Sequence, residues 1–215
     1  MSSNVSTLKP AFRPGMQPEN PGRRKMLVAA STAATAVGAG FVAVPFLASW
    51  LPSERAKAIG APVEVDISKL EPGALQTTLW QGNVVYILKR TPEMVETLAQ
   101  LDGQLRDPDS AESIQPEYAK NAARARRDDV VVMLGICTHL GCAPKLESKE
   151  QGRSDRGDAA WLGGFFCPCH GSKFDYAGRV YKGVPAPTNL VVPPYKFIND
   201  NLVLVGDDSE GGSNG

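Results

Sequence analysis

The sequence that decides the fold is Cys137-Thr-His-Leu-Gly-Cys142 together with Cys167-Pro-Cys-His-Gly-Ser172. These two segments contain all four cysteines and both histidines of the 215-residue chain. No other part of the chain can offer sulfur from cysteine or an imidazole to a metal. The two segments therefore indicate a metal centre that is built from two separate loops.

Counting ligands distinguishes two kinds of metal site. A structural zinc would take four of the six side chains, commonly from Cys-x2-Cys pairs, and neither loop has such a pair. A mixed-ligand [2Fe–2S] cluster needs two thiolates on one iron and two imidazoles on the other. Cys137 with Cys167, and His139 with His170, would meet that need. A zinc ribbon, or two simple disulfides with unused histidines, are the alternatives.

Cys142 and Cys169 would be left over by a mixed-ligand cluster. Each lies close in sequence to a ligand of its own loop, so the meeting of the loops should bring the two together. A disulfide between them would staple the loops around the cluster. It requires a Cα separation of about 4.4–6.8 Å and an oxidising compartment.

These motifs resemble the Rieske iron–sulfur proteins, and the two extra cysteines match the high-potential members of quinol-oxidising complexes. Residues 183–190 resemble the proline loop that shields the cluster. Residues 105–108 and 115–119 resemble a segment of the bacterial cytochrome bc1 subunit. The resemblance implies an all-β fold. It would be an antiparallel β sandwich with a small two-loop cluster-binding subdomain, plus one N-terminal transmembrane helix.

The resemblance also implies a function in the respiratory chain. The chain would be the electron-transfer subunit of a quinol–cytochrome c reductase, with one [2Fe–2S] cluster held by Cys137, His139, Cys167 and His170. His170 would take a proton from ubiquinol, and the electron would pass to cytochrome c1, contributing to proton translocation. The implied partners are the cytochrome b and cytochrome c1 subunits of a dimeric complex. The alternative is the Rieske subunit of a periplasmic arsenite oxidase.

Five further residues are implied to surround the cluster. Ser172 would donate its hydroxyl to a cluster sulfur, while Leu140, Gly141 and Pro185 would shield the cluster from water. Phe174 stands where many relatives have a tyrosine that donates to a ligand sulfur. One hydrogen-bond donor is therefore missing, which predicts a lower potential than in the tyrosine-bearing relatives.

Residues 23–50 predict a membrane anchor. Arg23-Arg24-Lys25 precede a stretch from Met26 to Ser53 that has no charged residue. A helix over Met26–Trp50 would be about 37 Å long, enough to cross a hydrocarbon core of about 30 Å. Basic residues before the span, and none just after it, place the N-terminus in the cytoplasm and the domain in the periplasm. The arginine pair also resembles a twin-arginine signal, which we expect to be retained in the bacterial inner membrane.

Composition predicts the remaining segments of the chain. Residues 1–22 are rich in Pro, Gly, Ser and Asn and predict a disordered tail. Residues 51–62 are predicted to form a flexible hinge and residues 63–206 the Rieske domain. Residues 207–215 are predicted to form a second disordered tail. From residue 54 onward there are 18 basic and 22 acidic residues, a net charge of −4. No basic patch is interleaved with aromatic residues, so nucleic-acid binding has no support.

Short apolar stretches predict the elements of the domain. Val63–Ile67 alternates as a half-buried strand does, and Leu75–Trp80 with Val84–Leu88 predict a hairpin around Gln81-Gly-Asn83. Thr91-Pro92 predicts the start of a helix, and Asp129–Ile136 a buried strand that leads into Cys137. We also expect a surface helix within 116–127, a charged connector over 147–158, and strands at 179–181, 191–192, 195–198 and 202–205.

Overall fold

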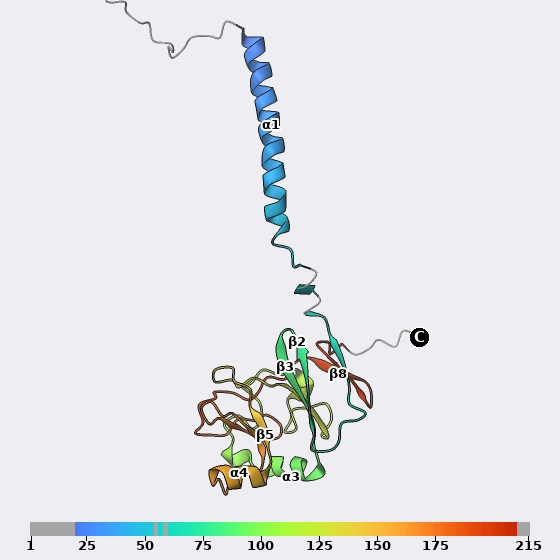
Figure 1. The fold of residues 1–215 in the computed structure, drawn as a ribbon, viewed down its shortest axis with the longest axis vertical. Coiled ribbons are helices and arrows are strands. Elements are labelled where there is room, and N and C mark those ends of the chain that lie inside the picture. Colours follow the sequence, from blue (N-terminus) through green and yellow to red (C-terminus); the bar gives the residue numbers. More distant parts are fainter. Residues whose placement is uncertain (1–19, 54–55, 58–59, 210–215) are drawn as a thin grey trace, which may run out of the picture. The chain divides into compact units, whose positions relative to one another are not determined.

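The computed structural model describes residues 20–53, 56–57 and 60–209 (Figure 1). Contacts divide the chain into two compact units, residues 1–53 and residues 54–215. Residues 1–19 of the predicted tail, 54–55 and 58–59 of the predicted hinge, and 210–215 of the C-terminal tail lie outside the described residues. The domain boundaries given above remain predictions.

The first unit contains one long helix, α1 (Pro21–Ala48, 28 residues). It begins five residues before the predicted Met26 because Asn20 caps it. The Asn20 side chain accepts a hydrogen bond from the backbone N–H of Arg23 (3.0 Å), and Pro21 suits the first turn. None of its residues is buried, and by length and composition it could cross a membrane.

The second unit is built around an antiparallel sheet of β2 (Leu75–Trp80), β3 (Asn83–Lys89) and β4 (Val130–Leu134), in the order β2-β3-β4. The predicted hairpin is confirmed. Its turn has two residues, Gln81 and Gly82, and both have positive φ (51° and 75°), the conformation of the tight turns that fit twisted hairpins.

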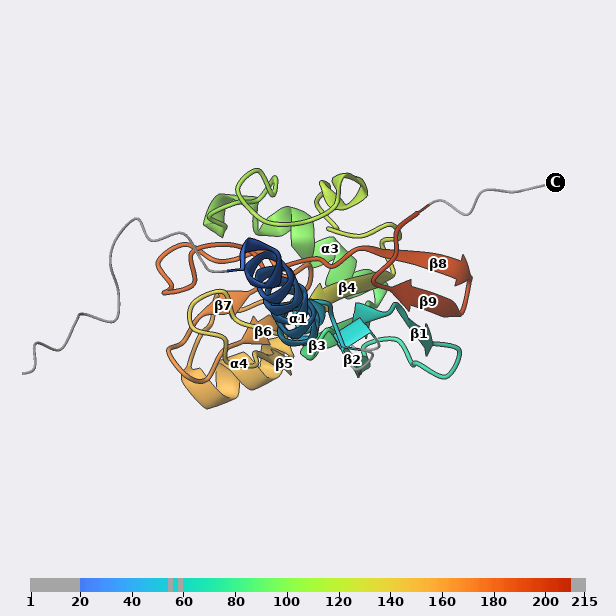
Figure 2. The same ribbon diagram turned by 90° about the horizontal axis from the view of Figure 1, so that it is seen from above.

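Two further antiparallel sheets lie on opposite sides of this middle sheet (Figure 2). One has the order β1-β9-β8 and the other the order β5-β6-β7. Their strands are β1 (Val63–Asp66), β9 (Leu202–Val205), β8 (Tyr195–Asn199), β5 (Lys145–Glu147), β6 (Gly164–Phe166) and β7 (Lys173–Phe174). The all-β prediction is confirmed, although the sequence reading missed the short strands β5 and β7.

The middle sheet is covered on both faces, which explains the continuous apolar sequence of β4. Val131 and Met133 pack in the same core as Phe165 and Phe174 of the β5-β6-β7 sheet. Alternate residues of β4 face the other core, which contains Val203 and Val205 of β9. Because side chains alternate across a strand, a strand buried on both faces has no polar positions.

One predicted helix is confirmed and another is wrong. Thr91 caps α3 (Pro92–Gln100) by accepting from the N–H of Met94 (3.3 Å). The helix expected within 116–127 is limited to one 3₁₀ turn, Glu117–Ala119. Arg124 explains the difference, because it has φ +49° and a fully buried side chain. Its guanidinium donates to the carbonyl oxygens of Ala177 and Gly178, so the chain turns inward here.

Two predicted strands near the C-terminal half are also wrong as regular strands. Residues 179–181 form only isolated bridges, Val180 with Phe174 and Tyr181 with Leu105. Residues 191–192 have no regular secondary structure. The last two predicted strands are confirmed as β8 and β9. A further 3₁₀ turn, Asp102–Gln104, follows α3.

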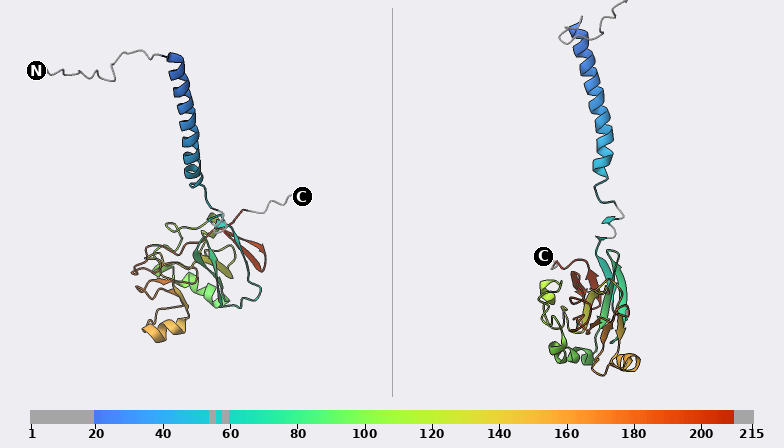
Figure 3. Two further views of the ribbon diagram at one scale, coloured as in Figure 1. Left: turned by 45° about the horizontal axis from the view of Figure 1, so that its top comes forward. Right: turned by 90° about the vertical axis from the view of Figure 1, so that its left-hand side faces the viewer.

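The connector predicted over 147–158 is instead a helix, α4 (Lys149–Arg156), at the same end of the domain as α3 (Figure 3). Ser148 and Gln151 form a capping box at its start, and Gly157 ends it with φ +65°. Trp161 packs against its inner face, 1% exposed, with Nε1 donating to the Ser148 carbonyl oxygen (3.0 Å). The Trp161 ring therefore covers the side of α4 that carries Gly152.

Gly152 is the point at which α4 contacts that ring, and alanine there should destabilise the domain. A Cβ at position 152 would lie 2.0 Å from Cδ1 of Trp161. Helix propensity favours alanine by about 1 kcal/mol, while overpacking costs about 1–3 kcal/mol. Since Trp161 is buried and hydrogen-bonded, we expect the clash to prevail and the unfolding midpoint in urea to fall. Ser154→Ala, on the exposed face, is the matched control; a Gly152→Ala protein as stable as the wild type would contradict this packing.

Candidate metal centre

The first loop, residues 137–142, follows directly from the buried strand β4. Its backbone closes on itself, because the N–H of Cys137 donates to the carbonyl oxygen of Cys142 (2.7 Å). The N–H of Gly141 donates in turn to the carbonyl oxygen of Cys137 (2.9 Å), and Gly141 has φ +84°. That conformation favours glycine. The turn holds Cys137 at its base, where the side chain is buried.

The second loop, residues 167–172, repeats this geometry between β6 and β7. The N–H of Cys167 donates to the carbonyl oxygen of Ser172 (2.8 Å), and that of Gly171 to the carbonyl oxygen of Cys167 (2.9 Å). Gly171 has φ +76°. Two loops with the same turn thus each present one buried thiol at their first position.

The structure brings the two members of each predicted ligand pair near each other. Cys137 and Cys167 are free thiols, each 2% exposed. The rings of His139 and His170 lie 4.8 Å apart between centroids, nearly perpendicular at 88°. His139 is half-buried, whereas His170 is exposed at the surface. The two imidazoles thus lie near each other, and the Cys137 thiol interacts with that of Cys167. Two thiols and two imidazoles are the donor set that a mixed-ligand cluster needs.

Burial raises the pKa of the Cys137 thiol, and the neighbouring Cys167 adds to this effect. Two thiolates held this close together in an apolar core would repel each other in the absence of a cation. A bound metal ion reverses that preference, because its positive charge stabilises thiolate ligands. A metal ion bound by Cys137 would therefore offset the cost of burying its thiolate.

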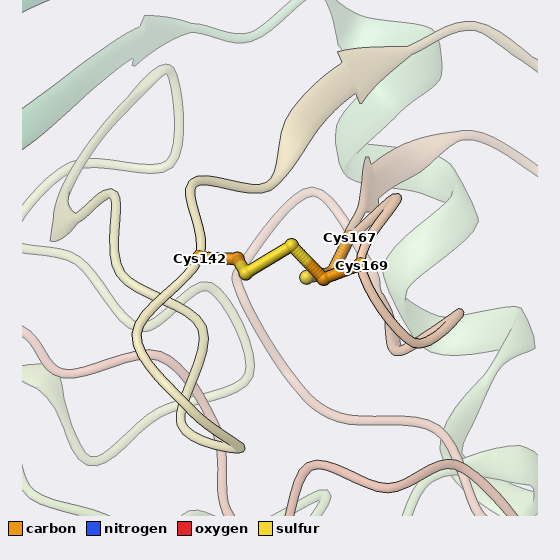
Figure 4. A group of neighbouring side chains, drawn as sticks. All are labelled: Cys142, Cys167 and Cys169. Carbon is orange, nitrogen blue, oxygen red and sulfur yellow. A yellow bond between two sulfur atoms is a disulfide. The ribbon is translucent and has the colours of Figure 1, made fainter.

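A disulfide joins the two loops, from Cys142 to Cys169, with a Cα–Cα distance of 6.6 Å (Figure 4). The sulfur of Cys167 lies within 4.8 Å of both sulfurs of this bridge. These three sulfurs do not themselves form a metal site, because a disulfide sulfur is not a thiolate. The bridge instead holds the two loops together, so that their free thiols face each other.

One atom of the site lacks a partner that a metal would supply. Nδ1 of His139 is buried and makes no hydrogen bond to any residue that the structure describes. Leaving a buried polar atom unpaired costs about 1–3 kcal/mol, so such atoms are uncommon in native proteins. Coordination of a metal by Nδ1 would remove that cost. The residues present therefore fit a cluster that takes two thiolates and two imidazoles.

Ser172 lies under the proline loop (residues 183–190) and is fully buried. Its Oγ accepts a hydrogen bond from the N–H of Ala186 (3.0 Å), which leaves the hydroxyl hydrogen free to donate elsewhere. The proline loop is also tied to the first loop, because Thr138 Oγ1 donates to the carbonyl oxygen of Thr188 (2.7 Å). Sequence reasoning missed both of these contacts.

The other residues predicted around the cluster divide into two groups. Phe174 is fully buried in the core beneath the loops. Leu140, Gly141 and Pro185 are exposed, and Leu140 is 72% exposed although it is a large apolar residue. Exposed apolar residues of this kind mark a surface for contact with another molecule. They would shield the cluster from water only when a partner covers them.

Tyr86 of β3 is a positioning residue that the sequence did not reveal. Its hydroxyl donates to the carbonyl oxygen of Pro144, just beyond the first loop (2.8 Å). Its ring stacks on Phe165, two residues before the second loop, with centroids 5.7 Å apart. The same ring lies against Gly135, where any Cβ would meet it at 2.4 Å. One side chain of the middle sheet thus supports both ligand loops.

Comparison with known proteins identifies relatives of this chain. Residues 105–196 match the profile of the Rieske [2Fe-2S] domain, and residues 16–53 match that of the Ubiquitinol-cytochrome C reductase Fe-S subunit TAT signal. The ubiquinol-cytochrome c reductase iron-sulfur subunit of Allochromatium vinosum is 53% identical over 189 residues, covering 88% of this chain and 90% of that protein. The protein of the same name from Bradyrhizobium diazoefficiens is 37% identical over 189 residues, covering 87% and 96%.

A solved structure also aligns with this chain. It is a chain of a hyperthermophilic respiratory Complex III, with 25% sequence identity and a TM-score of 0.45, and the alignment covers 83% of this chain and 98% of that one.

Proposed function

Because this chain belongs to the Rieske iron–sulfur subunits of ubiquinol–cytochrome c reductase, we propose that Cys137, His139, Cys167 and His170 hold its [2Fe–2S] cluster. The chain is the electron-transfer subunit of that respiratory complex. Three observations support the ligand assignment: the buried Nδ1 of His139 is unpaired, its ring contacts that of His170, and the two loops each hold a free buried thiol.

The residues have distinct tasks in this assignment. When bound, the cluster supplies a one-electron redox centre whose potential is raised by its two neutral imidazole ligands. Cys137 and Cys167 give the thiolates for one iron. His139 and His170 give a nitrogen each to the other iron and keep a second ring nitrogen that can hold a proton.

We assign the proton of ubiquinol to the free ring nitrogen of His170. His170 is exposed, whereas His139 is half-buried, so His170 is the ligand that a quinol bound to a partner subunit could reach. A structure of the native complex with a quinol-site inhibitor tests this assignment. We expect the inhibitor to hydrogen-bond His170, and an inhibitor bound to His139 instead would refute it.

The end of the domain that carries the ligand loops is the surface that contacts the partner subunits. Leu140 is exposed beside the ligands, and an apolar residue there suits a dry contact with the quinol site of a cytochrome b subunit. The cytochrome c1 subunit would receive the electron, within a dimeric complex. Residues 51–62 would act as the hinge that lets the domain move between these two partners.

The chain is anchored in a membrane by α1, and we propose that its N-terminus lies in the cytoplasm and its domain in the periplasm. The basic residues Arg23, Arg24 and Lys25 precede the span. The Cys142–Cys169 disulfide supports this orientation because such bonds persist in oxidising compartments. Protease added to intact spheroplasts tests the orientation. The domain should be digested without breaking the membrane, and a domain that is digested only after the membrane is broken would reverse the orientation.

The arsenite oxidase alternative has no support from the relatives named above. The two complexes differ in their other cofactors, since the quinol-oxidising one contains b-type haem and the arsenite oxidase a molybdenum subunit. Purifying the native complex through this chain and recording its haem spectrum distinguishes them. We expect b-type haem to copurify.

Replacing Phe174 by tyrosine should change the redox potential of the cluster. Phe174→Tyr would add a hydroxyl beneath the ligand loops, and a donor to a ligand sulfur stabilises the negative charge that reduction adds. We therefore expect the midpoint potential of Phe174→Tyr, measured by voltammetry, to be higher than that of the wild type. Phe174→Leu, which adds no donor, is the control. A potential equal to the wild type in Phe174→Tyr would eliminate this explanation.

A further inference from the structure

Residues 104–115 form a surface segment that lies along the proline loop and the chain that leads into it. Leu105 pairs with Tyr181 in an antiparallel bridge. The N–H of Arg106 donates to the carbonyl oxygen of Val180 (2.9 Å), and the N–H of Lys182 donates to that of Gln104 (2.8 Å). We call residues 104–115 the brace, because they run beside the proline loop at its start.

Asn189 fixes the other end of the proline loop to the brace. Its side chain is fully buried, and Nδ2 donates to the carbonyl oxygen of Asp107 (2.9 Å). Its Oδ1 accepts from the N–H of Val180 (2.8 Å), and its own N–H donates to Oγ of Ser113 (3.1 Å). Since each unmade bond of a buried amide costs about 1–3 kcal/mol, this residue holds three stretches of chain in one geometry.

The carboxylate of Asp107 shapes the brace that Asn189 binds. It is 5% exposed, and it accepts from the N–H of Ala111 (2.7 Å), the N–H of Glu112 (3.2 Å) and the hydroxyl of Ser113. A buried carboxylate is tolerated when hydrogen bonds replace its water. These bonds close the chain into a turn, which presents the Asp107 carbonyl and Ser113 to Asn189.

Arg106 reaches over the middle of the proline loop from the surface. Its Nη2 lies 3.3 Å from the carbonyl oxygen of Val184 and its Nη1 3.5 Å from that of Pro187. Ala186 lies between these two residues, and its N–H donates to Oγ of Ser172 (3.0 Å). The brace therefore holds the loop on both sides of the one amide that contacts this hydroxyl.

We propose that Arg106, Asp107 and Asn189 are positioning residues that set the redox potential through the Ser172 hydroxyl. They hold the Ala186 amide against Oγ, so that the hydroxyl hydrogen must point away from the loop and toward the ligand side. This inference rests on the proposed function, in which that hydrogen bonds a cluster sulfur. A loosened loop frees the hydroxyl to rotate, so the reduced cluster is stabilised less and the midpoint potential falls.

The test is a double-mutant cycle on the full chain with its cluster. Arg106→Ala and Asn189→Ala are each made alone and together with Ser172→Ala, and midpoint potentials are measured by voltammetry. Each single variant should lower the potential. Neither should lower it further once Ser172 is alanine, because residues that act through one group are not additive. Arg106 is exposed, so Arg106→Ala keeps the fold and decides the question even if Asn189→Ala does not fold.

Lys182→Ala is the matched control for charge. Lys182 is exposed, and its Nζ donates to the carbonyl oxygen of Gly103 (2.9 Å). The substitution Lys182→Ala therefore removes one positive charge near the same loop and leaves the Arg106 contacts intact. Its potential should equal that of the wild type. Arg106→Lys, which keeps a donor and the charge, should restore part of the shift.

Amide hydrogen exchange gives a second readout that does not depend on quinol oxidation. Exchange across residues 183–190 should be faster in Arg106→Ala and unchanged in Lys182→Ala. Three results would each overturn the positioning role. They are an unshifted potential in Arg106→Ala, an Arg106→Ala shift that is equal in the wild-type and Ser172→Ala backgrounds, and a similar shift in Lys182→Ala. A wild-type protein without a [2Fe–2S] EPR signal would instead overturn the proposed function, so the two failures are distinct.

Discussion

Replacing His139 or His170 by alanine is expected to abolish the [2Fe–2S] cluster. Each loop gives one sulfur and one nitrogen in our assignment, so the loss of either imidazole leaves one iron with a single protein ligand. Iron and acid-labile sulfide in the purified protein should fall close to zero. The visible absorption and the EPR signal of the reduced protein should disappear with them.

Leu140→Ala is the matched control for these variants. Leu140 is adjacent to His139 but is exposed and offers no ligand atom, so that protein should keep its iron and its EPR signal. A His139→Ala or His170→Ala protein that retains two irons and an unchanged spectrum would show that the ligand assignment is wrong.

Removing the disulfide should have the second largest effect. In the double variant Cys142→Ala/Cys169→Ala, the two loops lose a bond that closes a separation of 27 residues. The chain-entropy relation gives a loss of about 3–4 kcal/mol in the free energy of unfolding. We expect a lower unfolding midpoint in urea and a faster loss of the visible absorption on heating, because the ligand loops separate more easily.

A reducing agent provides the control for the disulfide. It should destabilise the wild type and leave the double variant unchanged, since the variant has no bond to reduce. Both cysteines are replaced together so that no third free thiol remains to compete with Cys137 and Cys167. A double variant as stable as the wild type would mean that the bond does not hold the loops.

The sequence alone was sufficient where a local pattern has a single physical explanation. Gln81-Gly82 between two apolar stretches indicated the hairpin, and Thr91-Pro92 indicated the start of α3. The two cysteine and histidine loops indicated the metal centre, because their ligand types occur nowhere else in the chain. In each of these cases the residues that decide the structure are neighbours in sequence.

The failures come from contacts that are distant in sequence. The stretch around Arg124 has helix-forming residues, yet burial of that side chain against Ala177 turns the chain inward. The charged residues of 147–158 favoured a solvated connector, whereas α4 is capped by Ser148 and Gln151 and covered by Trp161. Periodicity does not reveal the ring that a helix will meet.

The support around the site could not be predicted for the same reason. Tyr86 and Pro144 are 58 residues apart, and Asp107 and Asn189 are 82 apart. A buried tyrosine in a strand and an asparagine in a proline-rich loop are ordinary when viewed locally. Their importance depends on which carbonyl groups the fold brings within reach.

In our assignment, two loops that each give one thiol and one imidazole enclose a [2Fe–2S] cluster. The most direct measurement is metal and sulfide analysis of the purified chain, combined with EPR of the reduced protein. We expect two irons and two acid-labile sulfides per chain and a rhombic EPR signal of low average g, because one iron has imidazole ligands. One zinc per chain with no acid-labile sulfide and no EPR signal would contradict it.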